Sequence, residues 1–288
     1  MRRNCLVPCF GLSLAAFLAI SCAGGPAPAA APQKQRKERT VTVQVPVLVK
    51  ETSYFADGLV DEYAIYKYDA SLLVLLEKDS YDGSRPDPIE RVVAEVEGGR
   101  AKAESTYGAD GKLRLRREMT WDQGGRLLSE RTLDQKGSVQ SSSAYAYDAA
   151  GNRLEWKAFD GQGLLRAVTG YEYRDGRLVL VDMKDGAGKR TGSIAVEYDA
   201  AGLVAKRLYK AADGKLQKYE VPTYSAGRLM TLETRLADGS LVSRVAYTYG
   251  DLGQVLGSVV TDAAGAVKDR RSFEYTIRQD QKTEVYWE

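Results

Sequence analysis

The feature that most constrains this chain is a repeat with a period of about 25 residues. One aromatic position recurs at spacings of 26, 26, 25, 26, 25 and 26 along the chain, and it is occupied by Trp121, Tyr147, Tyr173, Tyr198, Tyr224, Tyr249 and Tyr275. Glycines keep the same phase, because gaps of 12 alternate with gaps of 13 or 14 from Gly99 to Gly265. A fixed period of this size indicates an array of one repeated supersecondary unit.

Each unit has two similar halves, and each half predicts a turn followed by a strand. In the unit that begins at Tyr147, Asp148 leads to Gly151, and Gly163 follows twelve positions later. Glycine tolerates the positive φ of tight turns, and aspartate can bond to its own backbone two residues on. Every second residue after this turn shares one face of a strand: Leu165, Ala167, Thr169, Tyr171 and Tyr173. The two halves together predict a β-hairpin.

Short segments within the units resemble a known bacterial repeat. Residues 147–154 read YDAAGNRL, and residues 198–203 read YDAAGL. These segments resemble the YD repeat, also called the RHS repeat, of bacterial surface and polymorphic-toxin proteins. The resemblance implies β-hairpin architecture and a cell-envelope location. The unit here is longer and internally doubled, and the chain is much shorter than the members that form a toxin-enclosing shell.

The N-terminal region is typical of a bacterial lipoprotein. Residues 1–21 have a basic start and an apolar stretch that is too short and too interrupted for a membrane-spanning helix, which favours a secretion signal. The small residues before Cys22 resemble a lipobox, whose cysteine receives acyl chains such as palmitate. The alternative is an ordinary signal peptide cut nearby, with Cys22 incidental. Because Cys5 and Cys9 lie inside the signal, Cys22 is expected to be the single cysteine of the mature chain.

The rest of the chain divides into three predicted regions. Residues 22–50 are rich in glycine, proline, alanine and basic residues, which predicts a tether that follows the lipidated cysteine. Its basic cluster at 34–39 could rest on anionic headgroups or be merely solvated, and residues 41–45 alternate like a strand. Residues 51–95 are expected to be atypical capping repeats, and residues 96–288 the regular hairpin array.

The predicted fold is all-β. Some eight units of two strands give about sixteen strands, more than an open sheet usually holds without curling or splitting. The sheet should therefore twist and coil. We expect tandem antiparallel hairpins forming an elongated, twisted or rolled sheet. A spiralling roll, a closed barrel-like shell and a long curved sheet remain alternatives at this point.

Composition argues against several functional classes. The sequence contains no histidine, which excludes histidine triads and histidine zinc sites. Without residues 1–21 the acidic and basic residues are equal in number, and no basic stripe favours nucleic acid. The acidic turns at 160–163 and 182–186 lack the carboxylate spacing of known calcium loops. We therefore expect no metal, no cofactor and no catalytic residue, although a carboxylate pair for glycan hydrolysis remains the alternative.

The recurring aromatics allow two interpretations. Equivalent positions in consecutive hairpins lie about 10 Å apart, which would form an aromatic ladder. The ladder could stack on sugar rings, or it could pack hairpins together, and regular recurrence favours the structural role. The sequence thus predicts a non-catalytic binding or scaffold module, held in the bacterial cell envelope by a lipid anchor, with an envelope protein or glycan as partner. The alternative is an envelope glycan hydrolase.

Overall fold

The computed structural model describes residues 36–287, which form eighteen β-strands and no helix. The strands are β1 (Arg36–Tyr54), β2 (Val60–Tyr68), β3 (Leu75–Asp82), β4 (Glu90–Glu97), β5 (Arg100–Gly108), β6 (Leu113–Trp121), β7 (Leu127–Asp134), β8 (Val139–Tyr147), β9 (Arg153–Asp160), β10 (Leu165–Arg174), β11 (Arg177–Asp185), β12 (Arg190–Tyr198), β13 (Val204–Ala211), β14 (Leu216–Ser225), β15 (Arg228–Leu236), β16 (Leu241–Tyr249), β17 (Val255–Asp262) and β18 (Val267–Trp287). The prediction of an all-β, antiparallel hairpin fold is confirmed.

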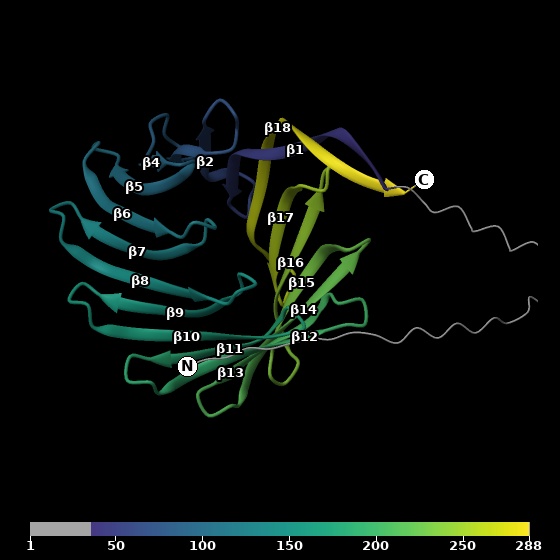
Figure 1. Cartoon of the computed structure of the whole chain (residues 1–288). Helices are drawn as coiled ribbons and strands as arrows, with labels where there is room; N and C mark the ends of the chain where they lie inside the picture. The colour runs from purple at the N-terminus through teal and green to yellow at the C-terminus, as the bar shows by residue number, and fades with distance from the viewer. Residues whose placement is uncertain (1–35, 288) are drawn as a thin grey trace, which may run out of the picture. The chain divides into compact units, whose positions relative to one another are not determined.

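The sheet closes on itself. Each strand pairs with the next one along the chain, and β1 pairs with both β2 and β18 (Figure 1). Side chains support the closing pair, because Glu51 lies 2.7 Å from Arg271 and the Tyr54 hydroxyl lies 2.9 Å from that of Ser272. Residues 42–282 therefore form a closed barrel, and the prediction of an elongated, rolled sheet is wrong. Pairing between the first and last strands leaves no open edge, which removes the unpaired backbone groups of a rolled sheet.

The two repeat periods correspond to two kinds of turn. After Tyr147 the turn has three residues and ends in Gly151, whose amide donates to the Asp148 carbonyl at 3.1 Å. After Tyr173 it has two residues, Asp175 and Gly176, with φ values of 52° and 73°. Positive φ at both central positions defines the type I′ hairpin turn, which is one residue shorter. The shorter units of the array are those that begin with this turn.

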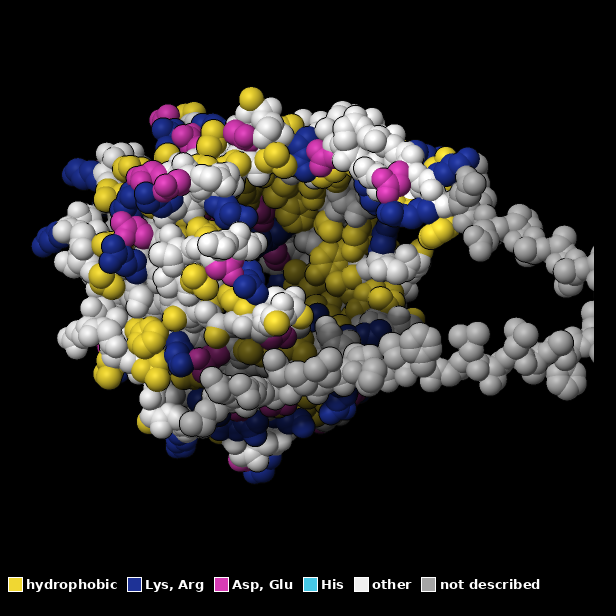
Figure 2. Space-filling view, viewed as in Figure 1, with side chains coloured by type: hydrophobic (Ala, Val, Ile, Leu, Met, Phe, Trp, Pro, Cys, Tyr) yellow, Lys and Arg dark blue, Asp and Glu magenta, His cyan; other side chains and the backbone are white. Residues whose placement is uncertain are grey.

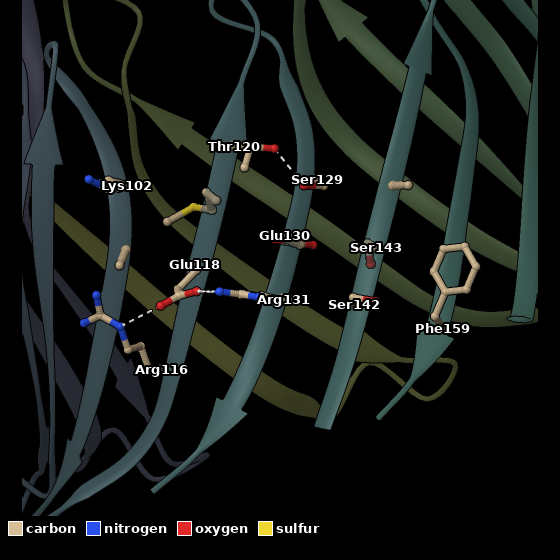
Figure 3. A pocket seen from close by; sticks show the side chains of 13 residues that line it. Lys102, Arg116, Glu118, Thr120, Ser129, Glu130, Arg131, Ser142, Ser143 and Phe159 are labelled. Carbon is tan, nitrogen blue, oxygen red and sulfur yellow. Dashed lines mark hydrogen bonds and ion pairs between the residues drawn. The ribbon is translucent and has the colours of Figure 1, made fainter. Parts of the chain in front are cut away.

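The barrel wall has two faces that the strand register identifies. Direct cross-strand partners share a face, so Glu118, Arg131, Ser142 and Phe159 lie on one side across β6–β9. Figure 3 shows this side turned away from the opposite wall of the barrel, and we call it the outward face. Along β16 the outward residues Val242, Arg244, Ala246 and Thr248 are exposed, whereas the inward residues between them are half-buried.

Two segments of the longest strands form a separate compact unit. Residues 36–41 of β1 and 283–287 of β18 make up its described part. Arg39 lies 2.9 Å from Glu284, and its guanidinium stands 5.7 Å from the ring centre of Tyr286. Strand β1 thus begins within the segment 22–50 that was expected to be a tether, and it includes the alternating residues 41–45.

Candidate functional site

The clearest candidate site is a groove of about 640 Å³ on the outward face of β5–β9. Small side chains form its floor, which is lined by Ala103, Ser129, Ser142 and Ala144. Figure 3 shows Phe159 at one end of the groove and the ion pairs of Arg116 at the other. The groove exists because small residues of β5, β7 and β8 come into register across the sheet.

A row of alternating charges crosses the groove. Arg116 donates to Glu95 at 2.8 Å and to Glu118 at 3.2 Å, and Arg131 donates to Glu118 at 2.7 Å. These hydrogen bonds, first from Arg131 and then from Arg116, lower the pKa of Glu118, and the bond from Arg116 lowers the pKa of Glu95. Each charge thus has a partner, so the groove offers polar contacts without a strong net charge.

Hydroxyl groups line the middle of the groove. Thr120 and Ser129 share a hydrogen bond of 2.7 Å, and Ser142 lies on the next strand. Together with the ring of Phe159, these groups resemble the mixture of hydroxyl and aromatic contacts that suits a polyhydroxylated or peptide-like partner. None of these residues belongs to the aromatic and cysteine positions predicted from the sequence. The run Ser141–Ser143 could have indicated the groove, because it stands where other strands have larger side chains.

The predicted repeat aromatics lie elsewhere, next to the hairpin turns. Five of the seven donate a side-chain hydrogen bond to the backbone carbonyl that lies twenty residues earlier. These bonds are Trp121 to Ala101 at 2.8 Å, Tyr147 to Leu127 at 2.9 Å, Tyr198 to Leu178 at 2.9 Å, Tyr249 to Leu229 at 2.6 Å and Tyr275 to Val255 at 2.7 Å. Tyr173 and Tyr224 are half-buried at the same position of their units but lack this bond. The aromatic position therefore connects neighbouring hairpins.

Arginines stack between this aromatic position and the following turn. Arg177 lies 5.5 Å from the ring centre of Tyr198, and the same contact is made by Arg126 on Tyr147 and by Arg228 on Tyr249. A Cβ added at Gly202 would lie 2.3 Å from the guanidinium of Arg177, and Gly202 also has a φ of +80°. Glycine is thus required at this turn both for its backbone conformation and for the close approach of the arginine.

One carboxylate of the wall is fully buried. Asp79 on β3 has 0% of its surface exposed and accepts hydrogen bonds of 2.7 Å from Arg91 and 2.7 Å from Lys67. Burial alone would raise the pKa of Asp79, but the hydrogen bonds from Arg91 and Lys67 outweigh it and the pKa is lowered. Asp79 is therefore held as a carboxylate that links three strands.

The turn aspartates are occupied by the backbone. Asp160 accepts hydrogen bonds from the amides of Gln162 at 3.0 Å and Leu164 at 2.9 Å, and Asp148 accepts one from the amide of Asn152 at 2.8 Å. Within residues 36–287 no group of three or more metal-ligating side chains is placed to hold an ion. In the two acidic turns considered for calcium, Asp160 and Asp185 each accept hydrogen bonds from two amides of their own turn, and Asp182 pairs with Arg190.

The perturbed carboxylates of the described residues are held in their charged form. A general acid needs a raised pKa. In the described part of the chain, the perturbed carboxylates, including Asp79, Glu95, Glu118, Asp182 and Glu233, all have lowered pKa values. Lys or Arg partners cause much of this lowering: Asp182 pairs with Arg190, and Glu233 pairs with Arg244 and Arg235.

The predicted signal and Cys22 lie outside the described residues. Within the described part, no helix has the length and apolar character needed to cross a membrane.

Comparisons with known proteins yield only weak structural similarities. No family model and no curated protein matches the chain. Its structure resembles the Tc holotoxin pore of Photorhabdus luminescens (15% identity, TM-score 0.28) and the TcdB2–TccC3 complex (15% identity, TM-score 0.30), in each case over 76% of this chain. The chain spans 14% and 15% of the length of those two toxin chains. A porin-like protein from Bacteroides uniformis aligns over 81% of this chain and 97% of its own, at 12% identity and a TM-score of 0.46. These values assign neither a family nor a function.

Proposed function

We propose that this chain is a non-catalytic binding or scaffold module of the bacterial envelope, held by a lipid at Cys22, that engages its partner through the outward groove of β5–β9. The observation that carries the proposal is the groove itself. It combines a floor of small side chains, paired charges and an aromatic side chain in a volume of about 640 Å³. These features provide shape and hydrogen-bonding contacts.

The lowered carboxylate pKa values support a binding role over hydrolysis. An envelope glycan hydrolase would need one carboxyl group that stays protonated near neutral pH. Glu118, one of the two carboxylates that line the groove, is held ionised by Arg131 and Arg116 instead. No observation favours the hydrolase, and a protein or glycan of the envelope remains the proposed partner class.

The unit formed by residues 36–41 and 283–287 supports an envelope location. Trp287 and Tyr286 are 61% and 38% exposed, and Arg36 and Arg39 lie on the partner segment of the same unit. Exposed tryptophan and tyrosine beside arginine are typical of segments that rest at a membrane surface. This unit follows the proposed anchor by fourteen residues, which span at most about 50 Å.

Two matched variants test the groove. Ala144→Trp fills its floor, whereas Ala246→Trp adds the same side chain to the outward face of β16. Crosslinking and pull-down from intact envelopes, together with sedimentation on purified envelope polysaccharide, should show that Ala144→Trp loses the partner and Ala246→Trp keeps it. Equal capture by both variants would refute the groove as the binding surface, and release of acidic or reducing sugars by the wild type would favour the hydrolase.

A further inference from the structure

The barrel of residues 42–282 is hollow. Barrels of about eight strands are filled by their own side chains, whereas those of sixteen to eighteen leave a lumen. Only four apolar residues of the described chain are buried: Val47, Ala64, Ala103 and Met119. Figure 2 shows the hollow directly, with hydrophobic side chains covering the part of its wall formed by β14–β17. The interior is therefore a space whose wall is apolar in part.

A continuous apolar strip crosses the inward face from β8 to β12. Cross-strand pairing joins Tyr145 to Trp156, Tyr171 to Val181 and Val181 to Ile194. The neighbouring row joins Trp156 to Thr169 and Thr169 to Met183. These side chains are half-buried apart from Thr169, which is buried, so much of the strip faces the lumen. Apolar surface left in contact with water costs free energy in proportion to its area.

One cation interrupts this strip. Arg153 pairs in register with Tyr147, and its guanidinium lies 4.9 Å from the ring centre of Tyr145 and 5.9 Å from that of Tyr171. No carboxylate among the described residues forms an ion pair with Arg153. This arrangement differs from the other inward arginines Arg117, Arg207 and Arg271, which each pair with a glutamate.

The repeat shows that Arg153 is an exception at an apolar position. The residue paired with the recurring aromatic is Leu127, Leu178, Val204, Leu229 or Val255 in the other units of the array. A charge placed among aromatic rings without an acidic partner loses hydration, and a bound anion would restore its electrostatic balance.

We propose that the lumen binds an anionic amphiphile with a long acyl chain, whose carboxylate pairs with Arg153 and whose chain lies along the apolar strip over β9–β12. The guanidinium forms a planar fork that fits a carboxylate through two parallel hydrogen bonds. The acyl chain replaces water on Trp156, Val181 and Ile194, and each methylene that it buries adds to affinity. The proposal stands independently of the outward groove and of Cys22.

Titration with cis-parinaric acid tests the proposal, because this fatty acid fluoresces in an apolar environment. The full chain, transferred from membranes into an amphipathic polymer, should bind it saturably and release it to palmitate. Ile194→Asp should weaken binding at least about tenfold, because it places a carboxylate in the strip. Ala195→Asp, the next residue on the same strand with its side chain on the outward face, should leave binding unchanged.

A second variant isolates the headgroup contact. Arg153→Met should weaken displacement by palmitate at least about tenfold while displacement by hexadecanol, which lacks the carboxylate, stays close to wild type. This variant keeps the apolar stem of the side chain, so it decides the question if Ile194→Asp does not fold, as chemical denaturation would show. Absence of saturable binding, equal loss in Ile194→Asp and Ala195→Asp, or equal effects of Arg153→Met on both displacers would each overturn the proposal.

Discussion

Removing one hydroxyl from the recurring aromatic position should destabilise the barrel in some repeats and leave it unchanged in others. In Tyr198→Phe the ring and its contact with Arg177 remain, and only the hydrogen bond of 2.9 Å to the Leu178 carbonyl is lost. A neutral intramolecular hydrogen bond contributes about 0.5 to 1.5 kcal/mol to stability. We therefore expect Tyr198→Phe, and likewise Tyr249→Phe, to lower the free energy of unfolding by about 1 kcal/mol.

The repeat supplies its own controls for this experiment. Tyr173 and Tyr224 occupy the same position of their units without the bond to the carbonyl twenty residues earlier. Tyr173→Phe and Tyr224→Phe should therefore change the free energy of unfolding by less than about 0.5 kcal/mol. Urea denaturation followed by tryptophan fluorescence measures all four variants. Equal destabilisation of the Tyr198 and Tyr249 variants and of the Tyr173 and Tyr224 variants would show that the hydroxyl hydrogen bond does not account for the stability that the aromatic position provides. Loss of glycan binding with unchanged urea midpoints would instead favour the interpretation that the rings stack on sugars.

Three further predictions concern charge, turn geometry and anchoring. Because Asp79 has a lowered pKa in the folded state, its stabilising effect is present above its unfolded pKa of about 3.9 and is lost as the pH falls through the folded pKa. The free energy of unfolding of Asp79→Asn, measured by urea denaturation from pH 6 to pH 2.5, should therefore fall less steeply than that of wild type. Parallel curves for the two proteins would contradict this. Gly202→Ala should lower the melting temperature more than Gly163→Ala. Both glycines have φ near +80°, but only Gly202 has an arginine where the Cβ would lie. Equal shifts in melting temperature would argue against the arginine contact. Cys22→Ala should remove the protein from membrane pellets or leave an unprocessed precursor on gels, whereas unchanged partitioning and migration would exclude the lipid anchor.

The local features of the fold could be predicted from the sequence because each depends on residues that are close together along the chain. The turn at Gly151 and the strand face containing Thr169 and Tyr171 follow from glycine's freedom at positive φ and from the pleat, and both are present. The alternation between the longer and the shorter period was also present in the sequence, as the shorter turn at Asp175 and Gly176. Only the link between turn type and period length required the structure.

Closure of the barrel could not be predicted from the sequence because it is a property of the whole sheet. Each hairpin adds a small twist and stagger, and whether β1 meets β18 depends on their sum over every strand. The groove has the same origin: Ala103, Ser129 and Ser142 lie far apart in sequence, and only the register of four strands makes them one floor. Periodicity tells which residues are equivalent, but it does not tell which equivalent residues face one another.

Breaks in the repeat are more informative about function than the repeat itself. The aromatic position recurs in every unit of the array, and recurrence is typical of a structural contact such as the bond from Tyr249 to Leu229. A binding site instead needs a residue that differs from its equivalents. Arg153 stands where five other units have leucine or valine, and an alignment of the units with one another is enough to reveal that difference. In a barrel made of near-identical hairpins, ligand specificity has to come from such exceptions, because the shared residues present the same chemistry in every direction.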